Sequence, residues 1–412
     1  MSKAEKSPIG PIFLTAFLDL LGIGIIIPII PALFFQDGSE FFAPGVSQSY
    51  RSILYGLLVA TYPIMQFIGA PILGALSDRH GRKPLLMISL TGTMIGYLLF
   101  ALAIYSHNLP LLFFSRMIPG FMGGNLSIIF SSIADVSDPE SKTRNFGLVG
   151  MAFGIGFILG PTIGGILGDN TVISWFSHVT PFLFTAALTG VNIALVQFRF
   201  RETLKEKRET KINAFSGFRN VAKSFQLPQL RALFVVVLFV ALGFSFFTQF
   251  FSVLLIQKFD FSTKNIGILY GWVGLWLAFT QGVTVRLLSR KFAASQILKV
   301  TPLLLAVAIG VLVLPDKSYL FFFLNPFVAT FQGITAPNMT SLISEQANPG
   351  QQGEILGINQ SMQSLGQAVP PLVAGYLNTL DVGLPIITGA VFVFLGWVVF
   401  VGFFRAVKRV KV

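Results

Sequence analysis

Twelve apolar segments, each long enough to cross a bilayer as a helix, are the feature that most restricts the fold of this 412-residue chain. A transmembrane helix needs about 20 mostly apolar residues. Charged residues make up only 11% of the chain, whereas ordinary soluble domains contain about 25%. The sequence therefore predicts an all-α polytopic membrane protein, with spans near residues 10–35, 52–77, 85–105, 110–134, 145–168, 179–199, 229–257, 265–289, 295–314, 318–343, 354–378 and 384–404.

The Lys and Arg residues are distributed asymmetrically between the two sides of these spans. Of the 29, 24 fall on one side, Arg116 lies within a span, and the other side has Arg51, Lys258, Lys264 and Lys317. Cytoplasmic loops carry the excess of Lys and Arg. We therefore expect a multi-pass protein of the cell (inner) membrane with both termini in the cytoplasm. The net charge of +12 then reflects topology, and no nucleic-acid partner is expected.

A polar stretch divides the spans six and six. We expect an N-terminal six-helix bundle at 1–199, a cytoplasmic linker at 200–228 and a C-terminal six-helix bundle at 229–412. In the second part of the linker, apolar residues recur at helical spacing: Ile212, Phe215, Phe218, Val221, Ala222 and Phe225. This pattern predicts an amphipathic helix lying on the inner membrane face. The alternative is an irregular linker.

The two halves of the sequence repeat each other. An offset of 210 residues superimposes acidic, proline and glycine positions: Asp135 on Glu345, Pro161 on Pro371, Gly165 on Gly375. An offset of 211 places Leu76-Ser77-Asp78-Arg79 on Leu287-Leu288-Ser289-Arg290. Parallel helical repeats with a substrate site between them are a common plan of secondary transporters. The duplication therefore indicates a transporter.

The short loop at 74–84 reads Gly-Ala-Leu-Ser-Asp-Arg-His-Gly-Arg-Lys-Pro. It resembles the signature between helices 2 and 3 of the major facilitator superfamily. The resemblance implies a cytoplasmic gate in which Asp78 faces the start of helix 11, expected near Gly353, while Arg79 and Arg82 reach the acid that ends helix 4. The gate residues are then Gly74, Asp78, Arg79, Gly81, Arg82 and Asp135. The alternative is a solvated turn that only fixes topology.

The fifth span contains the pattern Gly156-x-x-x-Gly160-Pro161-x-x-Gly164-Gly165. Small residues at four-residue spacing let membrane helices approach closely, and proline bends a helix. Generic packing would account for this pattern. However, it also resembles the helix-5 signature of proton-coupled antiporters within the same superfamily, which implies export rather than uptake.

Asp19 is the one acidic residue well inside a predicted span. An unpaired charge in lipid costs several kcal/mol, so such a residue is a functional candidate. Its surroundings, Leu18 to Pro28, resemble helix 1 of tetracycline-type efflux proteins. Arg116, in a sequence that resembles the family's helix-4 arginine signature, is its expected partner. We therefore expect Asp19 and Arg116 to form a proton-coupling site, with a permanent structural ion pair as the alternative.

Neutral amides dominate the polar positions of the C-terminal spans, where the acidic and histidine residues of a tetracycline carrier have no counterparts. Tetracycline itself is therefore a doubtful substrate. The expected cavity residues are Asn125, Gln249, Asn325, Gln332, Gln360 and Gln363, although helix-to-helix hydrogen bonds are an equal alternative for each.

Several other chemistries lack sequence support. The chain has no cysteine, no phosphate-binding Gly-Lys-Ser/Thr loop, and three histidines without metal-ligand spacing. We therefore expect a non-enzymatic transporter that works as a monomer by alternating access. It would export a small amphipathic compound or drug in exchange for protons, with the proton gradient as energy source and no cofactor. A proton-linked or facilitated importer of a sugar or organic acid remains open, as does a lipid flippase.

Overall fold

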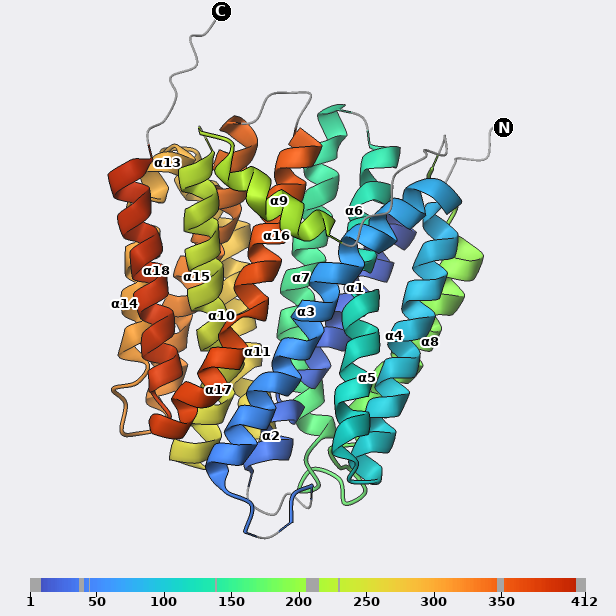
Figure 1. Ribbon diagram of the computed structural model, residues 1–412, viewed down its shortest axis with the longest axis vertical. Coiled ribbons are helices and arrows are strands. Elements are labelled where there is room, and N and C mark those ends of the chain that lie inside the picture. Colours follow the sequence, from blue (N-terminus) through green and yellow to red (C-terminus); the bar gives the residue numbers. More distant parts are fainter. Residues whose placement is uncertain are drawn as a thin grey trace, which may run out of the picture. The chain divides into compact units, whose positions relative to one another are not determined.

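The computed structural model describes residues 9–36, 41–43, 45–137, 139–204, 215–228, 230–346 and 352–404. Within these ranges the regular secondary structure is entirely helical (Figure 1). The most highly charged part of the predicted linker, residues 205–214, lies outside the described residues.

The helices belong to two compact units. The first consists of Met1–Leu33, Met65–Ala214 and Thr263–Gly271. Its helices are α1 (Ile9–Ile26), α4 (Arg82–Tyr105), α5 (Leu109–Met122), α6 (Asn125–Val136), α7 (Pro139–Leu167) and α8 (Thr180–Arg199), with the first part of α2 (Ile29–Phe35), the second part of α3 (Gln48–His80) and the first part of α11 (Thr263–Phe279).

The second unit consists of Phe34–Ile64, Phe215–Ser262 and Trp272–Val412. Besides the end of α2 (Ile29–Phe35) and the remaining parts of α3 and α11, it contains α9 (Ser216–Phe225), α10 (Arg231–Phe259), a π-helical segment (Thr280–Thr284), α12 (Val285–Ser289), α13 (Ala294–Ile297), α14 (Thr301–Val311), α15 (Leu320–Gln346), α16 (Gln352–Ala368), α17 (Pro370–Leu380) and α18 (Leu384–Phe403). Each unit thus includes segments from both halves of the sequence. The division into bundles at 1–199 and 229–412 stays a prediction.

The described helices account for the twelve predicted spans. Ten helical stretches are long and apolar enough to cross a membrane. The other two spans correspond to α7, with its apolar part Gly154–Leu167, and to α16 followed by α17. The protein is therefore an all-α polytopic membrane protein with twelve membrane-spanning segments.

Several spans are not continuous helices. The first changes from α1 to α2 around Pro28, which lacks the N–H that a helix interior needs. The fourth is divided at Gly123 and Gly124 into α5 and α6. The eighth contains the π-helical segment, a feature that often occurs at functional sites. The apolar periodicity of these spans gave no sign of the interruptions.

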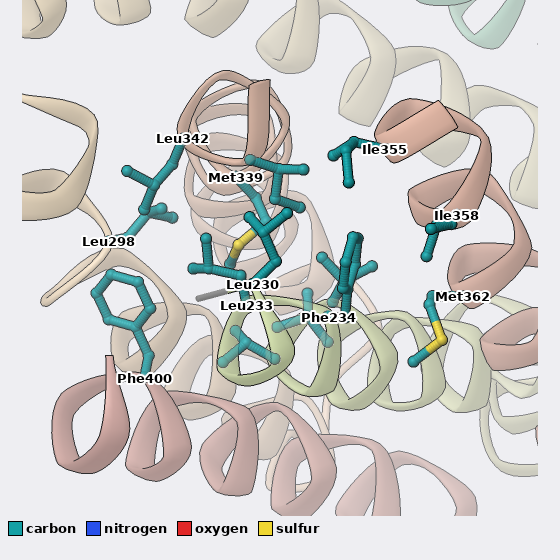
Figure 2. Packing of buried hydrophobic residues seen from close by; sticks show 14 residues of the cluster. Leu230, Leu233, Phe234, Leu298, Met339, Leu342, Ile355, Ile358, Met362 and Phe400 are labelled. Atoms are coloured by element: carbon teal, nitrogen blue, oxygen red, sulfur yellow. The ribbon is translucent and has the colours of Figure 1, made fainter. Parts of the chain in front are cut away.

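A buried apolar cluster holds the helices of the second unit together (Figure 2). Phe234 of α10 packs there with Met339 of α15, Ile358 of α16 and Phe400 of α18. Val221 of α9 lies against the same cluster. The predicted linker thus contains a helix over Ser216–Phe225, and one side of this helix is attached to this unit. Its position on the inner membrane face stays a prediction, and Ile212 lies outside the described residues.

Candidate functional site

The intramembrane acid Asp19 lies in α1 and is partly exposed. The polar group beside its carboxyl is the side chain of Asn125, the first residue of α6. Asn125 is only 1% exposed, and neither its Oδ1 nor its Nδ2 makes a hydrogen bond of regular geometry. A buried amide normally finds hydrogen-bond partners. The Asn125 amide therefore has a donor and an acceptor that its protein neighbours do not use in regular hydrogen bonds.

The break between α5 and α6 lies directly before Asn125. The carbonyl oxygens that it leaves outside helical hydrogen bonding are satisfied by two side chains. Gln66 Nε2 donates to the Gly123 carbonyl at 3.0 Å, and Ser89 Oγ donates to the carbonyl of Met122. Irregular backbone within a membrane requires such partners. A discontinuous helix beside an intramembrane acid is a typical arrangement of a transporter binding site.

Arg116 also belongs to this unit, in α5, and its side chain makes interactions within the structure. The coupling site of Asp19 with Arg116 stays a prediction, and Asn125 is the residue that the structure places beside the acid.

The loop at 74–84 brings charges from three helices together through Arg82, whose side chain is 6% exposed. Its guanidinium contacts the Asp78 carboxylate at 2.6 Å and the Asp135 carboxylate at 3.0 Å. It also donates to Ser77 Oγ at 2.6 Å. Arg79, in contrast, is exposed. Of the two arginines expected to reach the acid that ends helix 4, Arg82 is the one that does so.

Glu202, just after α8, completes this cluster. Its carboxylate accepts hydrogen bonds from the backbone N–H groups of Arg82 and Lys83 at the start of α4, and from those of Thr203 and Leu204. Desolvation by burial would raise the pKa of Glu202, but these donors outweigh it and lower the pKa of the carboxyl below its ordinary value. Gly81 has φ of 112°, and a Cβ atom there would approach Glu202 Oε2 to 2.6 Å.

The glycines of the fifth span lie against the backbone of α1. A Cβ atom at Gly160 would come within 2.6 Å of the Gly24 Cα, and one at Gly156 within 3.1 Å of the Leu20 carbonyl carbon. At Gly164 it would collide with the carbonyl oxygen of Ile25. The pattern therefore sets the close approach of α7 to the helix that carries Asp19. Pro161 lies within α7.

Two further glycine contacts join helices from the two halves of the sequence. In the first unit, a Cβ atom at Gly165 of α7 would lie 2.9 Å from the Cα of Gly267 in α11. In the second unit, a Cβ atom at Gly375 of α17 would lie 3.4 Å from the Cα of Gly56 in α3. Gly165 and Gly375 are repeat partners. Both repeat positions thus allow a helix to cross closely over a helix from the other half of the sequence.

An acidic site that the sequence did not single out follows α7. Asp169 is 8% exposed and accepts hydrogen bonds from Thr171 N and Oγ1. Desolvation would raise the pKa of Asp169, but the Thr171 donors, the Lys264 backbone N–H and the Lys264 charge outweigh it and lower the pKa. Burial lowers the pKa of His178, which the charge of Asp169 opposes. Asp169 thus connects the end of α7 to the start of α11.

The predicted cavity amides are not equivalent. Gln360 is exposed, and Gln249, Gln332 and Gln363 are partly exposed. Asn325 is 1% exposed and donates to the Phe321 carbonyl of its own helix. Four of the six predicted residues are therefore accessible, while Asn325 and Asn125 are enclosed.

Sequence reasoning missed Gln66, Ser89 and Glu202. The Gly123-Gly124 pair was a usable sign of a helix break, but nothing local identifies the side chains that satisfy it. The sign at Glu202 was an acid immediately after a span, at the start of an otherwise basic linker.

These features define a class before any relative is considered: a polytopic helical transporter, built from duplicated halves, with an interrupted span beside an intramembrane acid. The family profile of the Major Facilitator Superfamily matches residues 12–371. The chain belongs to this superfamily, whose members are transporters rather than enzymes.

Several relatives are similar along nearly their whole length. The class H tetracycline resistance protein of Pasteurella multocida is 30% identical over 384 residues, which cover 90% of this chain and 89% of that protein. Major facilitator superfamily domain-containing protein 10 of Mus musculus is 29% identical, and the match covers 90% of this chain and 87% of that protein. The crystal structure of the human organic anion transporter MFSD10 (TETRAN) has a TM-score of 0.73 at 23% identity, and the match covers 97% and 100% of the two chains.

Proposed function

We propose that this transporter exports a small amphipathic compound in exchange for protons. Asp19 is the observation that carries the proposal, because a carboxyl inside a span, beside an unsatisfied buried amide, can take up and release a proton. The similarity to a tetracycline resistance protein and the glycine pattern of α7 support the direction of transport.

The proposed cycle uses alternating access. Protonation of Asp19 would remove its charge and change its interaction with the Asn125 side chain, at the point where α6 begins. Opening of the cytoplasmic side would require the Arg82 contacts to loosen. The accessible amides Gln249, Gln332 and Gln363 would take part in recognition. The expected energy source is the proton gradient, and the expected setting is the inner membrane, with both termini cytoplasmic and a monomer as the functional form.

The test is transport by proteoliposomes with an imposed pH gradient, using a panel of amphipathic dyes and antibiotics that includes tetracycline. The wild type should release protons when substrate is added. Asp19→Asn should abolish this coupling, and Asp19→Glu should keep part of it. Asn192→Asp offers a control acid in α8 that should not replace Asp19. Proton-driven transport by Asp19→Asn would refute the assignment.

An organic anion is a second candidate substrate class. Arg116 is the one basic residue well inside a predicted span, and it could neutralise a carboxylate or sulfonate. The fold likeness to an organic anion transporter is in keeping with this class. Competition experiments with anionic, cationic and neutral dyes separate the two candidates, since Arg116→Gln should weaken binding of the anionic dyes selectively.

A further inference from the structure

A row of exposed aromatic side chains lies on α9 and on the residue just before it. Phe215, Phe218 and Phe225 are 70%, 55% and 49% exposed. Phe218 and Phe225 are seven residues apart, and Phe215 precedes Phe218 by three residues. At 3.6 residues per turn, the three rings therefore lie toward one side of the helix. We call this side the aromatic face of α9. Exposed apolar patches of this kind mark interaction sites.

The opposite side of α9 fixes the orientation of this face. Gly217 and Ser224 are buried, and Ser224 Oγ lies 3.6 Å from Met362 Sδ of α16. Asn220 Nδ2 donates to Ser361 Oγ of α16 at 3.2 Å. Because these contacts hold the helix to the second unit, the aromatic face cannot be covered by a simple rotation of α9.

Basic side chains border the aromatic face. Arg219 and Lys223 lie one and two turns after Phe215, along one edge of the face. Residues 215–228 contain no Asp or Glu. An apolar face with basic residues at its edge is typical of a helix in the interfacial plane, where long basic side chains reach toward lipid phosphates.

The direction of α9 suits the plane of a membrane. In Figure 1, α9 runs across the ends of α10 and α16 rather than along them. The chain enters the spanning helix α10 at Arg231, only a few residues after α9 ends. A helix that lies crosswise at the end of a spanning helix is parallel to the bilayer surface.

We propose that the aromatic face of α9 lies in the headgroup region of the inner leaflet and binds anionic phospholipids. The three rings enter the boundary between headgroups and acyl chains, while Arg219 and Lys223 contact lipid phosphates. The occupant is lipid rather than another protein, because the aromatic and basic groups adjoin on a helix attached to a bundle that lipid already surrounds. This binding is independent of the substrate and of the direction of transport.

The test uses the absence of cysteine from the chain. Phe218→Cys and Phe225→Cys are labelled with a nitroxide and reconstituted in phosphatidylcholine vesicles, with or without phosphatidylglycerol. Collision with oxygen reports contact with lipid, and collision with a water-soluble nickel chelate reports contact with water. Phe394→Cys, in α18, is the lipid reference, and Lys291→Cys, in an exposed turn, is the water reference. We expect both α9 labels to resemble Phe394→Cys, most strongly with phosphatidylglycerol.

The charges are tested by Arg219→Gln with Lys223→Gln in the labelled chain. Because each basic residue near an anionic surface adds several-fold to the attraction, the double substitution should reduce the preference for phosphatidylglycerol on the order of tenfold. The matched pair Arg290→Gln with Lys291→Gln should leave it unchanged at Phe218→Cys. Water-exposed α9 labels in both lipid mixtures, or shielding of Phe218→Cys by a second protein, would overturn the proposal.

Discussion

The loop at 74–84 and its repeat partner at 285–295 differ in whether their charges connect separate helices. In the first, Arg82 of α4 joins Asp78 of α3 and Asp135 of α6. In the second, Ser289 replaces Asp78 and donates to the Arg286 carbonyl of its own turn. Glu345, the partner of Asp135, accepts from Ser341 in its own helix.

The comparison shows which feature both copies of the repeat have and which feature only the first copy has. Both copies keep a short basic turn between consecutive spans, which suffices for topology. Only the first, among the described residues, holds a buried cation between two carboxylates. Such a cluster adds little net stability, but losing one partner is costly. We therefore propose that the contacts of Arg82 with Asp78 and Asp135 act as a latch, meaning a set of contacts that must loosen during transport. The second copy shows how the same turn looks without these contacts.

The largest difference is expected from Arg82→Gln and Arg290→Gln. Removal of the buried Arg82 charge leaves two partly buried carboxylates without their cation, at a cost of about 3–5 kcal/mol. Arg290 is exposed, so its replacement should change stability by about 0.5 kcal/mol or less. Thermal unfolding in detergent and initial transport rates measure the two effects. Similar losses of stability would show that the second turn is also a latch.

Asp78→Asn and Ser289→Ala test the repeat positions directly. Hydrogen bonds to charged groups contribute about 1.5–3 kcal/mol, so Asp78→Asn should loosen the contact with Arg82 and reduce transport on the order of tenfold. Ser289→Ala should have little effect, since its hydroxyl bonds within its own turn. Initial rates in vesicles provide the measurement. If both variants were equally impaired, the asymmetry would be wrong.

Gly81→Ala probes the backbone of the latch. The positive φ of Gly81 and the nearby Glu202 oxygen make any side chain costly, by about 1–3 kcal/mol. Gly282→Ala is the control in the second unit, because a Cβ atom there meets nothing within 4 Å. Thermal unfolding should distinguish the two variants, and an unchanged Gly81→Ala would argue against a rigid turn.

Glu202→Gln should have the smallest effect, and one that depends on pH. The folded-state pKa of Glu202 is below the ordinary value of 4.5. Its contribution is therefore present above about pH 4.5 and lost as the pH falls through the folded pKa. The melting temperatures of wild type and variant should differ at neutral pH and converge on acidification. Glu345→Gln is the control, and a difference that persists at low pH would contradict this reading.

The sequence predicted the spans better than their interruptions. The span expected at 85–105 was found at Arg82–Tyr105, because apolar length decides where a helix crosses. The break at Gly123 and Gly124 depends on hydrogen bonds from Gln66 and Ser89, which are distant in sequence. Such non-local partners leave no periodic signal.

The candidate site shows the same limit. The contact of Arg82 with Asp135 could be expected from the loop motif, because the motif specifies both groups. The contact of Asp19 with the neutral Asn125 could not, since no local sequence signal joins these two residues. The predicted pairing of Asp19 with Arg116 stays a prediction.

The interruption between α5 and α6 also has an electrical consequence. A helix start carries roughly half a positive elementary charge, from N–H groups that have no carbonyl partner within the helix. Since α6 starts at Asn125, the Asp19 carboxyl beside that side chain lies near such a start. An unbroken fourth span would provide no helix end there. In the proposed cycle, the backbone itself would therefore act as a fixed counter-charge for Asp19, so that a proton could leave the carboxyl without any arginine having to move.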